Sequence, residues 1–139
     1  METINPMSAR SLQYYVIDRR WASDLQFYNI ETAFLLRLLD DYFIRINNQG
    51  QIHNLKALGK KIYQLESDIC RCDQKLRQQI ETLEQLSEDA RDEDPEVLAV
   101  HQVHLELGMT KLITAFRDIK GDIFKMIEKV MREDKYAAG

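Results

Sequence analysis

Hydrophobic residues recur every seven positions through the middle of the chain, and a second row follows three residues behind the first. The two rows are Leu55, Ile62, Ile69, Leu76 and Leu83, and Leu58, Leu65, Cys72, Gln79 and Leu86. Only Gln79 breaks the apolar character. Spacing that alternates between three and four residues is typical of a helix that packs at a shallow angle on its neighbours. The pattern predicts a long helix over residues 52–88.

The last third of the chain repeats this spacing. Its seam reads Leu98, Gln102, Leu105, Met109, Leu112, Phe116, Ile119, Ile123, Met126 and Val130. The segment opens on Asp94, Pro95 and Glu96, which suit an N-cap, a first helical position and a first turn. These features predict a helix over residues 95–135. Gly108 and Gly121 lie inside it, and we interpret them as tolerated glycines, with close backbone approach at Gly108 and a mild hinge at Gly121 as alternatives.

The first third carries a wider apolar surface than a helix at the edge of a bundle needs. One row reads Trp21, Leu25, Tyr28, Thr32, Leu35, Leu39, Tyr42 and Ile46. Phe27, Phe34 and Leu38 form a second stripe beside it, so the apolar arc spans about 200° at about 100° per residue. This helix, over residues 8–47, therefore sits centrally among its neighbours or faces a second copy. We expect Phe27, Phe34 and Leu38 to be interface residues.

Two turn-forming stretches separate the three segments. Residues 47–50 read Asn-Asn-Gln-Gly, and residues 87–95 are rich in acids and end in proline. Three helices of similar length with short connections predict an all-α, elongated antiparallel up-down bundle and a single domain over residues 1–139. Ser23 and Gln26 also fit a capping box, which leaves a four-helix alternative with a break near residues 20–23.

Composition narrows the class of protein and its compartment. The 139 residues carry a net charge of −4, so a broadly basic nucleic-acid-binding surface is not expected. No apolar run approaches the roughly 20 residues of a membrane span, and residues 1–7 lack the pattern of a signal peptide. Cys70 and Cys72 point about 200° apart on a helix, and we expect reduced thiols. We therefore predict a cytoplasmic protein with no nucleic-acid or membrane partner.

Few residues carry a recognisable chemistry. His101 and His104 are three residues apart on a helix, so both imidazoles are able to reach one metal ion. The Glu-x-x-His pairs of carboxylate-bridged metal bundles do not occur in the sequence. The two histidines are metal candidates without a third ligand, and no cofactor is predicted. Phosphate-binding glycine loops and nucleophile motifs are also missing from the sequence. The prediction is a protein without catalytic residues that is not an enzyme.

Glu31 is the most unusual charge, because it falls within the wide apolar arc of the first segment. A buried carboxylate must be paired or neutralised. Aligning the starts of the first and third helices places it near residue 118, level with Lys120. Glu31 and Lys120 are therefore candidates for a buried ion pair that fixes register, and the alternative is that both side chains extend to solvent.

Charge is distributed unevenly along the sequence. Residues 81–106 hold nine acidic side chains and one arginine, whereas residues 37–64 hold five basic and two acidic ones. The expected bundle has oppositely charged ends, either of which is a possible docking surface for a protein partner. The leading hypothesis is a non-enzymatic bundle that acts through protein–protein contact and forms a homodimer. The alternative is a bundle that binds a small ligand or a metal.

Overall fold

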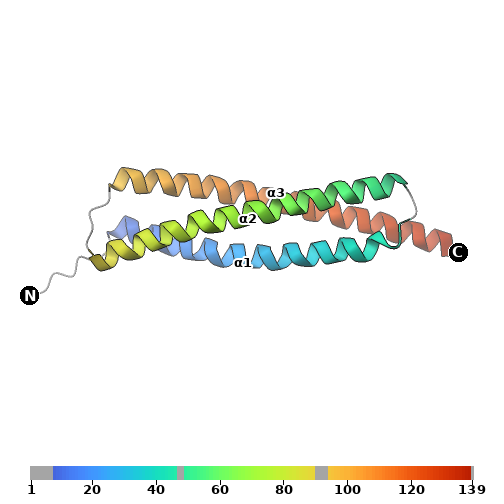
Figure 1. Cartoon of the computed structure of the whole chain (residues 1–139), viewed down its shortest axis with the longest axis horizontal. Helices are drawn as coiled ribbons and strands as arrows, with labels where there is room; N and C mark the ends of the chain where they lie inside the picture. The colour runs from blue at the N-terminus through green and yellow to red at the C-terminus, as the bar shows by residue number, and fades with distance from the viewer. Residues whose placement is uncertain (1–7, 47–48, 90–93, 139) are drawn as a thin grey trace, which may run out of the picture. The chain divides into compact units, whose positions relative to one another are not determined.

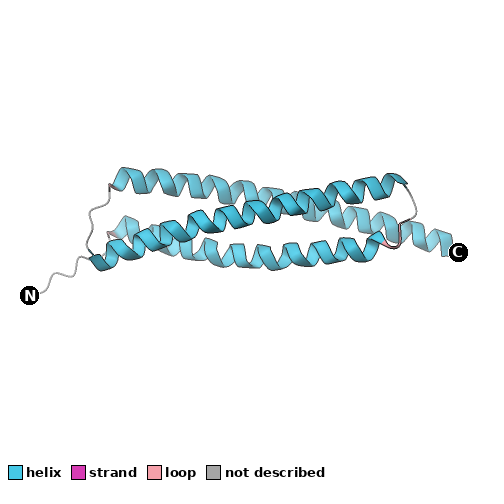
Figure 2. Ribbon diagram, viewed as in Figure 1, coloured by secondary structure: helices cyan, strands magenta, loops and turns pink. Residues whose placement is uncertain are grey.

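A computed structural model of the chain describes residues 8–46, 49–89 and 94–138 (Figure 1). It consists of three helices, α1 (Ala9–Phe43), α2 (Gln49–Asp89) and α3 (Pro95–Ala138), and Figure 2 shows no strand within these ranges. The prediction of an all-α bundle of three long helices is confirmed. The four-helix alternative is wrong, because α1 continues without interruption through residues 20–23. No proline or glycine occurs there to break it.

Side chains cap the first turns of α1 and α3. Ser8 Oγ accepts a hydrogen bond from the Ser11 backbone N–H at 3.1 Å, and Asp94 Oδ1 accepts one from the Glu96 backbone N–H at 2.9 Å. Pro95 occupies the first helical position of α3. A backbone N–H at this position would have no acceptor within the helix, so proline costs no hydrogen bond there. The predicted start of the third helix is therefore confirmed.

The first connection lies earlier in the chain than its sequence suggests, because α1 ends at Phe43 rather than near residue 47. A tight turn follows α1, with backbone hydrogen bonds across three residues up to Ile46. Gln49 and Gly50, which belong to the predicted turn, are already helical. Asn47 and Asn48, as well as residues 90–93 of the second predicted connection and residues 1–7, lie outside the described residues.

The chain divides into two compact units, each of which takes one part of every helix. Unit 1 combines Met1–Phe27 with Cys70–Lys111, and unit 2 combines Tyr28–Ile69 with Leu112–Gly139. Within each unit the segment of α2 runs antiparallel to the segments of α1 and α3 (Figure 1). Each unit therefore has its own three-helix core.

The core of unit 1 mixes aliphatic and polar side chains. Its buried apolar residues come from all three helices: Leu25, Leu76, Ile80, Leu83, Leu98, Leu105 and Met109. Asp18, Gln79 and Gln102, one from each helix, are buried among them, and Ser11 near the start of α1 is buried as well. Gln79 and Gln102 are the two polar positions in the predicted seams of α2 and α3, and both face the core.

The core of unit 2 is more uniformly apolar. Its buried aliphatic and aromatic residues are Leu35, Leu39, Ile46, Leu55, Leu58, Ile62, Leu65, Ile69, Leu112, Phe116, Ile119, Ile123, Ile127 and Val130. Thr32 is buried too, and its hydroxyl donates to the Tyr28 carbonyl oxygen at 2.6 Å. The rings of Tyr28 and Phe116 lie 4.8 Å apart in a tilted arrangement, which joins α1 to α3.

The glycines of α3 have no packing role in the structure. An added Cβ at Gly108 or Gly121 meets no heavy atom within 4 Å. The alternative of a close backbone approach at Gly108 is therefore wrong, because the neighbouring helices leave room there for a side chain.

Candidate functional site

The strongest concentration of polar chemistry is a buried layer in unit 1, which we call the polar layer and define as Asp18, Gln79 and Gln102. These residues are only 0, 5 and 7% exposed, respectively. Gln102 Nε2 donates a hydrogen bond to Asp18 Oδ1 at 2.7 Å, which joins α3 to α1. Asp18 Oδ2, Gln79 Nε2 and Gln102 Oε1 are buried without a hydrogen-bond partner. Unpaired polar atoms are rare in protein cores, so this layer is chemically unusual.

The carboxyl group of Asp18 is the most perturbed acid of the described chain. Burial raises its pKa from the ordinary 3.8 to about 6, and the hydrogen bond from Gln102 opposes this increase only in part. Burial disfavours the charged form because a carboxylate loses its hydration in the core. The pKa of Asp18 therefore lies closer to neutral pH than that of an ordinary aspartate.

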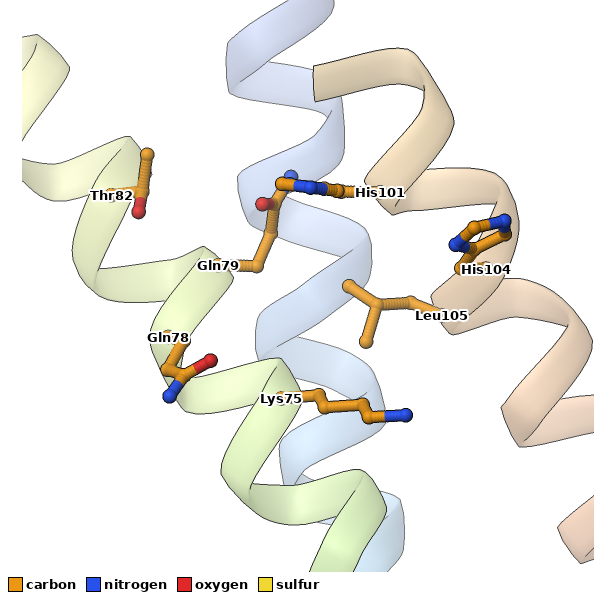
Figure 3. A pocket seen from close by; sticks show the side chains of 7 residues that line it. All are labelled: Lys75, Gln78, Gln79, Thr82, His101, His104 and Leu105. Carbon is orange, nitrogen blue, oxygen red and sulfur yellow. The ribbon is translucent and has the colours of Figure 1, made fainter. Parts of the chain in front are cut away.

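A pocket of about 370 Å³ lies beside this layer, between α2 and α3 of unit 1. Its walls consist of Lys75, Gln78, Gln79, Thr82, His101, His104 and Leu105. Figure 3 shows Lys75 and Gln79 extending from α2 toward α3. In the same view His101 and Leu105 extend from α3 toward α2. Gln79 thus belongs both to the polar layer and to the pocket.

His101 and His104, the candidate metal ligands, both line this pocket and are exposed. Within the residues that the structure describes, no group of three or more histidine, cysteine, aspartate or glutamate side chains is placed to hold a metal ion. A metal bound here would have two protein ligands, fewer than the usual three or four of zinc sites.

The two cysteines of unit 1 are free thiols. Cys70 is exposed, whereas Cys72 is half-buried and its Sγ lies 3.6 Å from Met109 Sδ. Burial raises the pKa of the Cys72 thiol, and nearby Lys75 opposes this effect. A thiol with a raised pKa is less often a thiolate, so Cys72 has the character of a core residue rather than of an activated nucleophile.

In unit 2, Glu31 and Lys120 are brought together at the edge of the core. Lys120 Nζ lies 3.5 Å from Glu31 Oε1, and the side chains of Lys120 and Glu31 are 38 and 23% exposed. The two residues are paired, and both side chains are partly exposed. The Lys120 ammonium group lies 5.8 Å from the centre of the Phe116 ring, so its stem covers apolar surface while its charge stays near water.

The interface candidates Phe27, Phe34 and Leu38 lie on the outer side of α1. Phe27, in unit 1, and Phe34, in unit 2, are both exposed, and Leu38 is half-buried. Unit 2 also exposes Ile30, which the sequence analysis did not single out. Ile30, Phe34 and Leu38 follow one another every four residues and form a continuous ridge on one helix. We call these three residues the apolar row.

Asp18 is not among the predicted site residues, although the sequence holds a signal for it. The apolar seam of α1 was started at Trp21, and extending the same spacing by three residues reaches Asp18. Gln79 is predictable as the one polar interruption of its seam, but its place beside a pocket is not.

The described helices include none that is long and apolar enough to cross a membrane. Comparison with protein-family models, with curated proteins and with solved structures finds no match to this chain. Any functional assignment therefore depends on the residues of the chain itself. The charged stretches at residues 37–64 and 81–106 belong to unit 2 and unit 1, respectively, and a protein partner for either one stays a prediction.

Proposed function

We propose that the chain is a non-enzymatic helical-bundle protein that acts through protein–protein contact and forms a homodimer through the apolar row of α1. The observation that carries this proposal is the exposure of Ile30 and Phe34, which are 70 and 47% exposed in the structure. Large apolar side chains that follow one another along a helix are typical of binding surfaces. The proposed setting is the cytoplasm, where thiols such as Cys70 and Cys72 stay reduced.

The apolar row is suited to pairing with a second copy of itself. Residues spaced by four form the ridges that pack into the grooves of a neighbouring helix in the commonest class of helix pairs. In a two-fold contact centred on Phe34, the two α1 helices run in opposite directions. Leu38 of one copy then opposes Ile30 of the other, so apolar side chains meet at both ends of the row. The row has the self-complementary order that such a contact requires.

The mass of the purified protein tests this proposal. We expect light scattering to report a dimer at micromolar concentration and Phe34→Lys to give folded monomers, because a lysine in the centre of the contact would be buried without a partner. Phe43→Lys is the matched control. Phe43 is also an exposed residue of α1 in unit 2, but it lies outside the apolar row. It lines a separate pocket together with residues of α2 such as Tyr63.

Two results would contradict the proposal. A monomer mass for the unaltered chain at micromolar concentration would exclude the homodimer. A dimer that persists in Phe34→Lys, with a helical circular dichroism spectrum, would move the contact away from the apolar row.

A further inference from the structure

Among the described residues that line the pocket of unit 1 are several hydrogen-bond donors and one ammonium group, and none is an acid. Lys75 contributes an ammonium group, Thr82 a hydroxyl, and Gln79 an amide, while His101 and His104 contribute imidazoles. Leu105 supplies an apolar wall. A ligand that matches this lining brings acceptor atoms and negative charge to one side and an apolar body to the other.

The buried amide of Gln79 points to a ligand. Its side chain is 95% buried, it lines the pocket, and its Nε2 has no hydrogen-bond partner. Buried donors in proteins are nearly always paired, so this unpaired donor is available to an acceptor group that enters the pocket.

Two acids of unit 1, Glu84 and Asp73, are engaged away from this pocket. Glu84 Oε1 accepts a hydrogen bond from the Tyr15 hydroxyl of α1 at 3.3 Å, and the Asp73 carboxylate pairs with Arg77 at 2.8 Å on α2 itself. Neither acid lines the pocket. Among the described residues that line the pocket, Lys75 is the one that carries a formal charge at pH 7.

We propose that this pocket binds a small organic anion, a carboxylate or a phosphate monoester, whose apolar body contacts Leu105. Lys75 and His101 bind the anionic group, and Gln79 Nε2 donates a hydrogen bond to one of its oxygens. A volume of about 370 Å³ lies within the range of small-molecule sites, about 300–1,000 Å³. The proposal uses no residue of the apolar row, so its outcome is independent of the homodimer.

Titration of the ¹⁵N-labelled full chain with phenyl phosphate, benzoate and the neutral analogue benzamide tests the proposal. At pH 7 and 150 mM NaCl we expect saturable amide shifts around residues 75–82 and 101–105 with either or both anions, and no shift with benzamide. The two anions separate a phosphate ligand from a carboxylate ligand. Moderate salt excludes attraction that depends on charge alone.

Exposed residues of the pocket provide variants that keep the fold. Lys75→Met and His101→Gln should each weaken binding by about tenfold or more, because each removes a charged or polar contact to the anion. Lys111→Met and His53→Gln are matched controls at exposed positions outside the pocket, and they should bind as the unaltered chain does. Circular dichroism of all four confirms that the helices remain.

Several outcomes would overturn the proposal. Equal shifts with benzamide would show that the anionic group is not recognised, and shifts that Lys75→Met leaves unchanged would place binding elsewhere. No saturable shift with either anion at millimolar concentration would exclude a site of this class. Tight binding of Zn²⁺ alone, abolished in His101→Gln and in His104→Gln, with no anion binding, would replace the anion by a metal.

Discussion

Replacing Asp18 by asparagine should stabilise the protein at neutral pH and should do so less in acid. The carboxyl group of Asp18 is fully buried and has only one oxygen in a hydrogen bond. Asparagine has the same shape and no charge. Its Nδ2 is able to donate to Gln102 Oε1, which has no partner in the structure, while its Oδ1 still accepts from Gln102 Nε2.

The raised pKa sets the size and the sign of the effect. Between the unfolded pKa of about 3.8 and the folded pKa of about 6, the folded chain holds more protons than the unfolded chain. The free energy of unfolding therefore falls as pH rises through this window and stays lower above it. A shift of about two pKa units corresponds to about 3 kcal/mol at pH 7.5. About half of this penalty disappears by pH 5.

Urea denaturation followed by circular dichroism at pH 7.5 and pH 5.0 measures this difference. We expect the free energy of unfolding of Asp18→Asn to exceed that of the unaltered chain by about 2–3 kcal/mol at pH 7.5 and by clearly less at pH 5.0. Asp118→Asn, at an exposed position of α3, is the control and should not change the stability difference between the two pH values. A stability difference between Asp18→Asn and the unaltered chain that is the same at both pH values would refute the reasoning.

Three further substitutions test the fold. Leu65→Asp should destabilise the protein by several kcal/mol, because it places an unpaired charge at a position that is 1% exposed, and an unchanged melting temperature would contradict the assigned core. Gly121→Ala should stabilise the protein by about 0.5–1 kcal/mol in urea titrations, since alanine is the better helix former and its Cβ meets no neighbour. Asp94→Ala should lower stability by about 1 kcal/mol in the same titrations, whereas Asp94→Asn, which keeps a capping oxygen, should lower it less.

The repeating pattern was sufficient to predict the helices and most of the core. All five residues of the first heptad row of α2, from Leu55 to Leu83, are buried. The start of α3 followed from Asp94 and Pro95, because capping and the fixed φ of proline act within a few residues. Hydrophobic periodicity and helix capping depend on residues close together in the sequence, so these features are predictable for each helix by itself.

The site depends on register between helices, which the sequence restricts only loosely. Aligning the starts of α1 and α3 placed Glu31 near residue 118, and its partner in unit 2 is Lys120. In unit 1, Asp18 binds Gln102, three residues before the position that the same alignment gives. An error of about one helical turn in register matters little where leucine faces leucine. The same error changes which polar side chains lie within hydrogen-bond distance of each other. The polar layer and its pocket therefore became visible only in the structure.

Gln79→Leu should separate stability from binding in a single variant. Gln79 occupies a position in the heptad seam of α2 where leucine is the expected residue, and its unpartnered Nε2 is buried. Leucine removes that unpaired donor and adds buried apolar surface, so we expect the unfolding free energy in urea to rise by about 1–2 kcal/mol. The same change removes the one fully buried donor of the pocket, and phenyl phosphate should bind about tenfold more weakly. Leu76→Ala, at a buried position outside the pocket lining, is the opposite control, since it should lower stability by about 2–5 kcal/mol and leave binding to the folded chain unchanged. A Gln79→Leu protein that is more stable and binds the anion as before would show that the buried amide interrupts the seam without serving the pocket.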